Sequence, residues 1–234
     1  MTIAKNKKTL FILVAILACL LLATLSFKYY LPQKPQKVFI SGTLVERSLE
    51  DLFSKSALVV RGTVNKSSET FKIQNTNGGI AIFTDYKFDV SEFVRGDDLN
   101  NELTIRVQGG TIGNATEVYE HSPVLSSEND YLLFLYKPAR GGAYNTDGDY
   151  YYILGLTQGT FVENEEGDYI SESGVVLFAD DIAQYVKTAD PVNTNYFREE
   201  YIANQMRNLE TGFITQEQYE DIINKIDEYA TIVK

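Results

Sequence analysis

The sequence has almost none of the residues that build disulfide frameworks and metal centres. Its 234 residues contain one cysteine, one histidine and no tryptophan. Cys19 lies inside an apolar N-terminal run, so the folded part has neither a disulfide nor a cysteine-ligated zinc site. The single His121 excludes a metal site built from several histidines. We therefore expect the protein to use no cofactor.

Positive charge is also scarce. The chain has 21 Lys and Arg against 32 Asp and Glu, a net charge of −11. Residues 1–37 hold six of the lysines and no acid, which leaves a net charge of −17 on the remainder. A body this acidic repels nucleic acid and anionic lipid, and no basic stripe offers either a binding surface. We expect no nucleic-acid partner.

One long apolar run stands at the N-terminus. Residues 10–27 are almost wholly apolar and follow Lys5, Lys7 and Lys8. These 18 residues approach the ~20 that a helix needs to cross the hydrocarbon core of a bilayer. Basic residues before such a span keep the N-terminus in the cytoplasm. The pattern predicts a single-pass signal anchor in the cell membrane, with everything after residue 30 extracytoplasmic.

Two alternatives to a retained anchor remain open. Thr24 and Ser26 form a small-residue pattern that allows cleavage near Ser26, which would make the protein secreted. Residues 16–19 loosely match a lipoprotein signal ending at Cys19, but the apolar run continues beyond it. All three interpretations place the acidic body outside the cytoplasmic membrane. Usage rich in Lys, Asn and Ile suits a bacterium.

The chain after the apolar run changes from strand to helix periodicity. Tyr131–Tyr136 is apolar throughout, as in a central strand that is covered on both faces. Short strands with turn signals between them, and no interleaved long helices, predict a mainly β fold, a small OB-like barrel or sandwich of about six strands. The expected strands are 57–64, 86–90, 103–107, 131–136, 150–154 and 160–162, with 169–170 pairing to the last.

Two helices are expected after the strands. Ile202, Met206 and Leu209 share one face of a helix that starts near residue 194. Gly212 ends this helix, and Thr215 with Gln218 forms a capping box that begins the next. The expected organisation is a cytoplasmic tip and anchor over 1–30, a tether over 31–47, a β domain over 48–190 and a helical hairpin over 191–234 that packs on it.

Two resemblances follow from these residues. The order of Ser48–Leu52, Ser56–Val64, Thr84–Val90, Phe93–Gly96, Ile105–Gly110 and Asp130–Leu135 resembles exported bacterial domains of unknown function. The pattern is also similar to the OB-like barrel of netrin and metalloproteinase-inhibitor modules over residues 48–165, although the netrin-type cysteines are absent. Leu209–Tyr219 resembles the short C-terminal hairpins called SHOCT-like, which implies oligomerisation or docking.

No catalytic residues emerge from the sequence. His121 and Ser122 are adjacent and do not form a nucleophile–base pair, and no Gly-x-Ser-x-Gly elbow exists. The many acidic residues cluster in turns, where solvated charge is the ordinary explanation. We interpret His121 as a loop residue. We expect a non-enzymatic protein; the alternative is a hydrolase that acts on envelope glycan or peptide through paired carboxylates.

Two groups of residues are candidates for binding. Asn145, Asp147 and Asp149 place oxygen ligands at alternate positions, as calcium loops do, but the twelfth position, Leu156, is not the usual Glu. A polar turn is the default interpretation. Tyr144, Tyr150 and Tyr152 are candidates for an aromatic patch, since one parity of the 150–152 run is expected to be exposed and tyrosine suits sugar or protein contacts.

These observations predict a membrane-anchored, extracytoplasmic binding or interaction module of the bacterial cell envelope. The expected partners are the membrane, through residues 10–27, and an envelope protein or glycan. An alternative is a scaffold that self-associates through residues 194–230. An exposed aromatic site would favour the module, whereas two acids converging in a pocket would favour the hydrolase.

Overall fold

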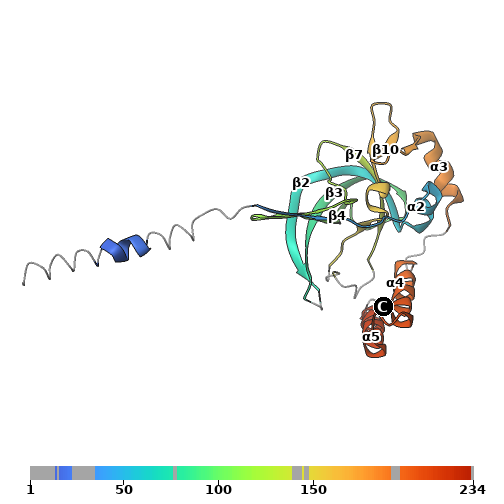
Figure 1. Ribbon diagram of the computed structural model, residues 1–234. Coiled ribbons are helices and arrows are strands. Elements are labelled where there is room, and N and C mark those ends of the chain that lie inside the picture. The colour runs from blue at the N-terminus through green and yellow to red at the C-terminus, as the bar shows by residue number, and fades with distance from the viewer. Residues whose placement is uncertain are drawn as a thin grey trace, which may run out of the picture. The chain divides into compact units, whose positions relative to one another are not determined.

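The computed structural model describes residues 14, 16–22, 35–75, 78–138, 144, 148–190 and 196–232 (Figure 1). The chain divides into two compact units, residues 1–36 and 37–234. In the first, residues 14 and 16–22 are helical. No helix within the described ranges is both long and apolar enough to span a membrane. The rest of the expected 10–27 span, with Ser26, lies outside the described residues, so the anchor stays a prediction.

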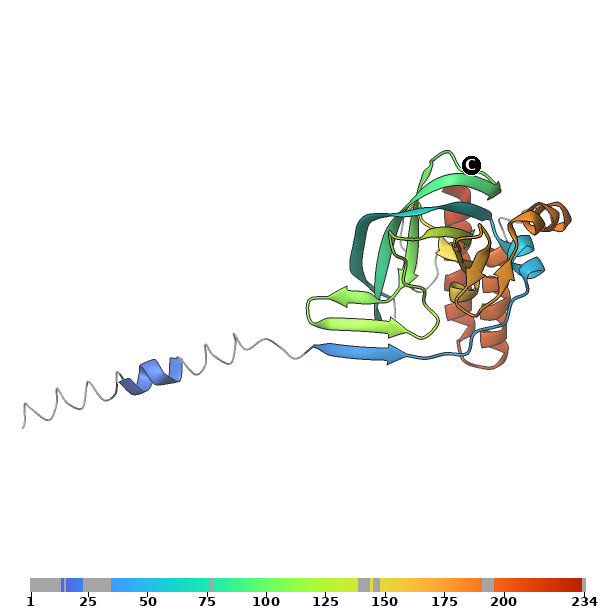
Figure 2. The ribbon, with the colours of Figure 1, turned by 90° about the horizontal axis from the view of Figure 1, so that it is seen from above.

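The second unit contains two β-sheets. One has eight strands, in the order β11-β10-β9-β7-β2-β3-β4 with β8 paired to β7, and the other has three, in the order β1-β6-β5 (Figures 1 and 2). The strands are β1 (Gln36–Ile40), β2 (Leu58–Gln74), β3 (Ile80–Arg95), β4 (Glu102–Gln108), β5 (Gly110–Ile112), β6 (Ala115–Tyr119), β7 (Asp130–Tyr136), β8 (Tyr152–Ile153), β9 (Thr160–Glu163), β10 (Tyr169–Ser171) and β11 (Val176–Leu177).

The mainly β class is confirmed, but the expectation of about six strands is wrong. β2 and β3 run for 17 and 16 residues and pair from Val59↔Arg95 to Gln74↔Ile80. Much of the added length is polar, so hydrophobic alternation does not signal it; backbone pairing between the two strands sustains it instead. β1, β5 and β6 were not expected either, because β1 is almost wholly exposed and β5 has only three residues.

β7 separates two apolar cores. Tyr131, Leu133 and Leu135 belong to one buried cluster, whereas Leu132 and Phe134 belong to the other. Successive strand residues point to opposite faces, so a strand that is apolar at every position serves both cores. The prediction of a central strand covered on both faces is thus confirmed. The predicted pairing of residues 169–170 with the strand at 160–162 is also confirmed, as β10 with β9.

A close approach between β2 and β3 requires glycine at position 62. A Cβ atom built on Gly62 would lie 2.1 Å from the Asp89 carbonyl oxygen and 2.9 Å from a ring carbon of Phe88. The register shifts between Arg61 and Gly62, which marks a β-bulge. The extra residue, Ser91, lies on β3, because Arg61 pairs with Glu92 and Gly62 with Val90. Figure 1 shows the paired strand β2 strongly curved.

Two short helices cover the second core. α2 (Leu49–Lys55) begins at Ser48, whose hydroxyl accepts a hydrogen bond from the Asp51 amide. α3 (Ala179–Thr188) was not expected: Asp180 and Asp181 lie in its first turn, where acids favour a helix. Phe53 of α2 contacts both Phe134 and Tyr185, with ring centroids 4.9 and 5.2 Å apart.

The C-terminal helical hairpin is confirmed. α4 (Tyr196–Glu210) ends before Gly212, which has a φ of +74°, and α5 (Gln216–Ile232) follows. Thr215 and Gln218 make the two reciprocal hydrogen bonds of the predicted capping box. Packing of this hairpin on the β domain stays a prediction.

Candidate ligand-binding site

Four aromatic side chains line a cavity of about 260 Å³ in the β domain, which we call the tyrosine cavity. Phe83 comes from β3, Tyr136 from the end of β7 and Tyr152 from β8, and Tyr144 precedes β8 in the chain. Phe83 is fully buried, whereas the three tyrosines are partly exposed. Three of the four rings are therefore placed by strands, and solvent still reaches part of each tyrosine.

The aromatic rings contact one another in pairs. The centroids of Phe83 and Tyr144 lie 5.9 Å apart, and those of Tyr136 and Tyr152 lie 5.8 Å apart. Tyr144 and Tyr152 also pack on the small buried cluster of Ile73, Ala81 and Phe83. Centroid distances of roughly 4.5–7 Å are typical of stabilising aromatic pairs, at about 0.5–1.5 kcal/mol each. The cavity is thus preformed by its own side chains.

A buried arginine forms part of the same wall. Arg106 of β4 is 6% exposed, and its Nε and Nη2 atoms each donate to a carboxylate oxygen of Asp85 at 2.8 Å. The two residues face each other directly across β3 and β4. Burial lowers the pKa of Arg106, but the hydrogen bonds and charge of Asp85 outweigh it and raise that pKa overall. Arg106 therefore stays charged and fixed in position.

Two aromatic rings hold the guanidinium of Arg106 as well. Its central carbon lies 3.7 Å from the Tyr150 ring centroid and 4.8 Å from that of Phe71. Planar guanidinium groups stack favourably on aromatic faces. Arg106 also borders a neighbouring cavity of about 310 Å³, together with Tyr150, Asp85, Glu69 and other polar residues. The Arg106 side chain therefore lines both of these adjacent cavities.

The three tyrosines of the expected aromatic patch lie close to this arginine. Tyr144 and Tyr152 line the tyrosine cavity, and Tyr150 lines the neighbouring one. Tyr150 contacts Tyr152 with ring centroids 5.6 Å apart. Burial raises the pKa of the Tyr152 phenol, so this group remains a neutral hydrogen-bond donor well above physiological pH.

Alternate residues of the 150–152 run, which share one face of the strand, were expected to be exposed, and this expectation is wrong. Tyr150 and Tyr151 are each only 4% exposed. Tyr150 is covered by the guanidinium of Arg106, whereas Tyr151 belongs to the first core and donates a hydrogen bond of 2.5 Å to Asp98. Both faces of this segment are therefore buried, and only Tyr152 is partly open.

The candidate calcium residues are only partly within the described structure. Asn145 and Asp147 lie outside the described residues. The Asp149 carboxylate forms an ion pair of 2.9 Å with Lys137. Within the described part of the chain, no three His, Cys, Asp or Glu side chains gather closely enough to hold a metal ion.

Carboxylates also line a wider hollow of about 660 Å³. Asp97, Asp98 and Asp149 border it, together with Lys137 and Tyr151. Burial raises the pKa of Asp98, but hydrogen bonds from Tyr151 and from backbone amides outweigh burial and lower it overall. A general acid needs a raised pKa, so Asp98 is suited to accepting hydrogen bonds rather than to donating a proton.

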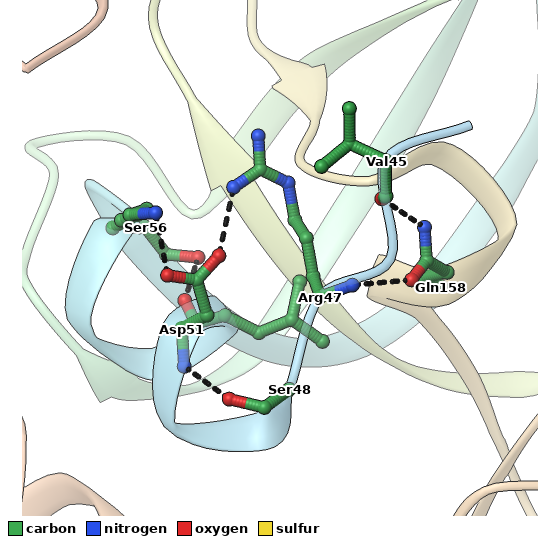
Figure 3. A network of polar contacts seen from close by, with 8 residues as sticks. Val45, Arg47, Ser48, Asp51, Ser56 and Gln158 are labelled. Carbon is green, nitrogen blue, oxygen red and sulfur yellow. Dashed lines mark hydrogen bonds and ion pairs between the residues drawn. The ribbon is translucent and has the colours of Figure 1, made fainter. Parts of the chain in front are cut away.

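His121 borders a different hollow of about 560 Å³, which it shares with Arg47 and Gln158. The Gln158 side chain accepts a hydrogen bond from the Arg47 amide and donates one to the Val45 carbonyl (Figure 3). Arg47 in turn pairs with Asp51 at 2.9 Å. These contacts attach part of the expected tether to the β domain. Their arrangement explains how the segment is anchored.

Comparison with known proteins adds no assignment: the sequence matches no protein-family model, and no curated protein is significantly similar to it.

The sequence alone placed Tyr144, Tyr150 and Tyr152 among the candidate residues but did not point to Arg106 and Asp85. Arg106 lies within the expected strand 103–107, and Asp85 directly precedes the expected strand 86–90. The pair becomes visible only once the register between those strands is known.

Proposed function

We propose that this protein is a membrane-anchored, extracytoplasmic binding module of the bacterial cell envelope. It is non-enzymatic, and it holds its ligand in the tyrosine cavity. The observation that carries the proposal is the cavity itself, in which aromatic rings and the fixed guanidinium of Arg106 converge. Apolar walls with a few well-placed polar groups are the usual composition of ligand sites.

The location rests on the sequence. The apolar run over residues 10–27 and the lysines before it support a single-pass anchor with the β domain outside the cytoplasm. Cleavage near Ser26 would release the same module. The partner is an envelope glycan or protein, because those are the ligands that such a location offers.

A residue-specific NMR experiment tests the binding role. The full-length chain in detergent micelles, with ¹³C-labelled tyrosine, is titrated with neutral oligosaccharides, a proline-rich peptide, and acidic and basic peptides. We expect at least one probe to shift the signals of Tyr144 and Tyr152 saturably. Tyr219 on α5 serves as the control and should stay unchanged. If no probe class shifts the two cavity tyrosines, the binding role is contradicted.

A further inference from the structure

We infer that the tyrosine cavity takes a neutral, hydroxyl-rich ring, namely one sugar unit of an uncharged glycan. This inference rests on the proposed binding function and names its ligand class. It follows from the charge, the aromatic faces and the hydrogen-bonding groups of the cavity wall.

The charge balance of the wall favours an uncharged ligand. Arg106 is the one charged side chain among the described residues that line the cavity, and Asp85 neutralises it through two hydrogen bonds of 2.8 Å. A carboxylate or phosphate on the ligand would meet a guanidinium whose charge Asp85 already balances. The net charge of −17 after residue 37 adds a repulsive field against polyanions.

The aromatic faces suit the C–H face of a sugar ring. Tyr144 and Tyr152 contact different neighbours, Phe83 and Tyr136 respectively, and both are partly exposed in the cavity wall. Rigid tyrosine rings provide a large apolar contact area at a low cost in conformational entropy, and they carry a polar group at the tip. A ring with one apolar face and hydroxyl groups around its edge matches such a surface.

Polar groups in the wall are available for those hydroxyls. Within the described part of the chain, the side-chain amide of Gln108 and the hydroxyls of Tyr144 and Tyr152 make no hydrogen bond to protein. Amide and phenol groups both donate and accept, as pairing with sugar hydroxyls requires.

The size of the cavity limits the ligand to a single ring. Its volume of about 260 Å³ falls just below the ~300–1,000 Å³ of pockets that hold drug-sized molecules. The neighbouring hollow of about 310 Å³ shares Arg106 and is lined by polar residues such as Glu69 and Thr104. A glycan can therefore place one unit in the tyrosine cavity and the next beside Arg106.

Calorimetric titration of the full-length chain in detergent tests this inference. The probes are the uncharged disaccharides N,N′-diacetylchitobiose and maltose, with glucosamine and glucuronic acid as cationic and anionic counterparts. We expect saturable binding of at least one neutral sugar and no binding of the charged ones. Tyr152→Ala and Tyr144→Ala should each weaken that binding by about tenfold or more, because each removes one aromatic face.

Matched variants separate loss of the site from loss of the fold. Tyr152→Phe keeps the ring and should weaken binding less than Tyr152→Ala does. Tyr219→Ala, on the C-terminal hairpin, should bind like the wild type, and unchanged circular dichroism confirms that each variant is folded. Sugar binding that is insensitive to both Tyr144→Ala and Tyr152→Ala would overturn the inference.

The peptide probes of the NMR experiment distinguish the two proposals. If a peptide shifts Tyr144 and Tyr152 while neither neutral disaccharide binds, the sugar inference fails and the binding function stands. If neither peptides nor sugars reach these tyrosines, both fail.

Discussion

Replacing Asp85 by asparagine removes the counter-charge of a buried arginine without changing the shape of the side chain. In the wild type, the side chains of Arg106 and Asp85 are 7% and 18% exposed, and two hydrogen bonds join them. The asparagine would retain one acceptor oxygen and turn an NH₂ group toward the guanidinium, so one hydrogen bond is lost together with the charge. The positive charge of Arg106 then remains in a poorly hydrated site.

The expected loss of folding stability follows from these contacts. Removing one partner of a buried ion pair typically costs about 3–5 kcal/mol. Here the rings of Phe71 and Tyr150 still face the guanidinium, and Asp85 is not completely enclosed. We therefore expect Asp85→Asn to lower the free energy of unfolding by about 2–4 kcal/mol. For a protein of this size, that lowers Tm by roughly 4–16 °C.

The chain offers a matched control in the same sheet. Arg61 and Glu92 also face each other across two strands and form one ion pair of 2.8 Å, but their side chains are 29% and 53% exposed. Glu92→Gln should cost less than about 1 kcal/mol, because water screens exposed pairs. Urea unfolding of the full-length variants, followed by circular dichroism, measures both. A loss for Asp85→Asn no larger than that for Glu92→Gln would refute the reasoning.

Three further predictions concern ionisation, capping and calcium. Burial and Glu117 raise the pKa of Tyr119 to about 12, and burial is the main cause that raises the pKa of Tyr169 to about 12. Unfolded tyrosines ionise near pH 10, so the unfolded chain loses these protons first and the free energy of unfolding falls as pH rises from about 10 to 12. A free energy of unfolding that stays constant over this range in urea titrations would contradict the raised pKa values. Ser48→Ala removes the cap of α2 and should cost about 0.5–2 kcal/mol in urea unfolding; an unchanged midpoint would show that the cap contributes nothing. Native mass spectrometry with millimolar calcium should show no bound ion, because Asp149 already pairs with Lys137; a shift of one calcium mass would instead support the 145–149 site.

Hydrophobic periodicity predicted the elements whose side chains are buried. The β3 segment at 86–90, β4 and β7 all show either alternation or a continuous apolar run, and the structure has a strand at each of them. The polar extension of β2 beyond residue 64 and the three-residue β5 gave no such signal, because backbone pairing rather than side-chain burial defines them. α3 gives no clear sequence signal, because paired acids such as Asp180 and Asp181 in its first turn also occur in polar turns.

The candidate site depends on register, which local pattern does not determine. Asp85 and Arg106 are 21 positions apart, and they meet because β3 and β4 pair with Asp89 opposite Glu102. A slip of one residue would move either side chain to the other face of the sheet. Residue type and the alternation of the 150–152 run make Tyr144 and Tyr152 candidates, but their shared cavity requires Phe83 from a strand much earlier in the chain.

The pairing of β2 with β7 bears on how the domain folds during synthesis. β2 pairs with β3, its neighbour in sequence, but its other edge pairs with β7, where Leu58 lies opposite Leu135. This contact closes the long loop between Leu58 and Leu135, which costs conformational entropy before the contact stabilises the domain. Contacts between residues distant in sequence also slow folding. The β2–β3 ribbon can form early, yet both cores stay incomplete until β7 has been made. The first half of the domain therefore presents an unpaired apolar strand edge to chaperones and proteases for as long as residue 135 is missing.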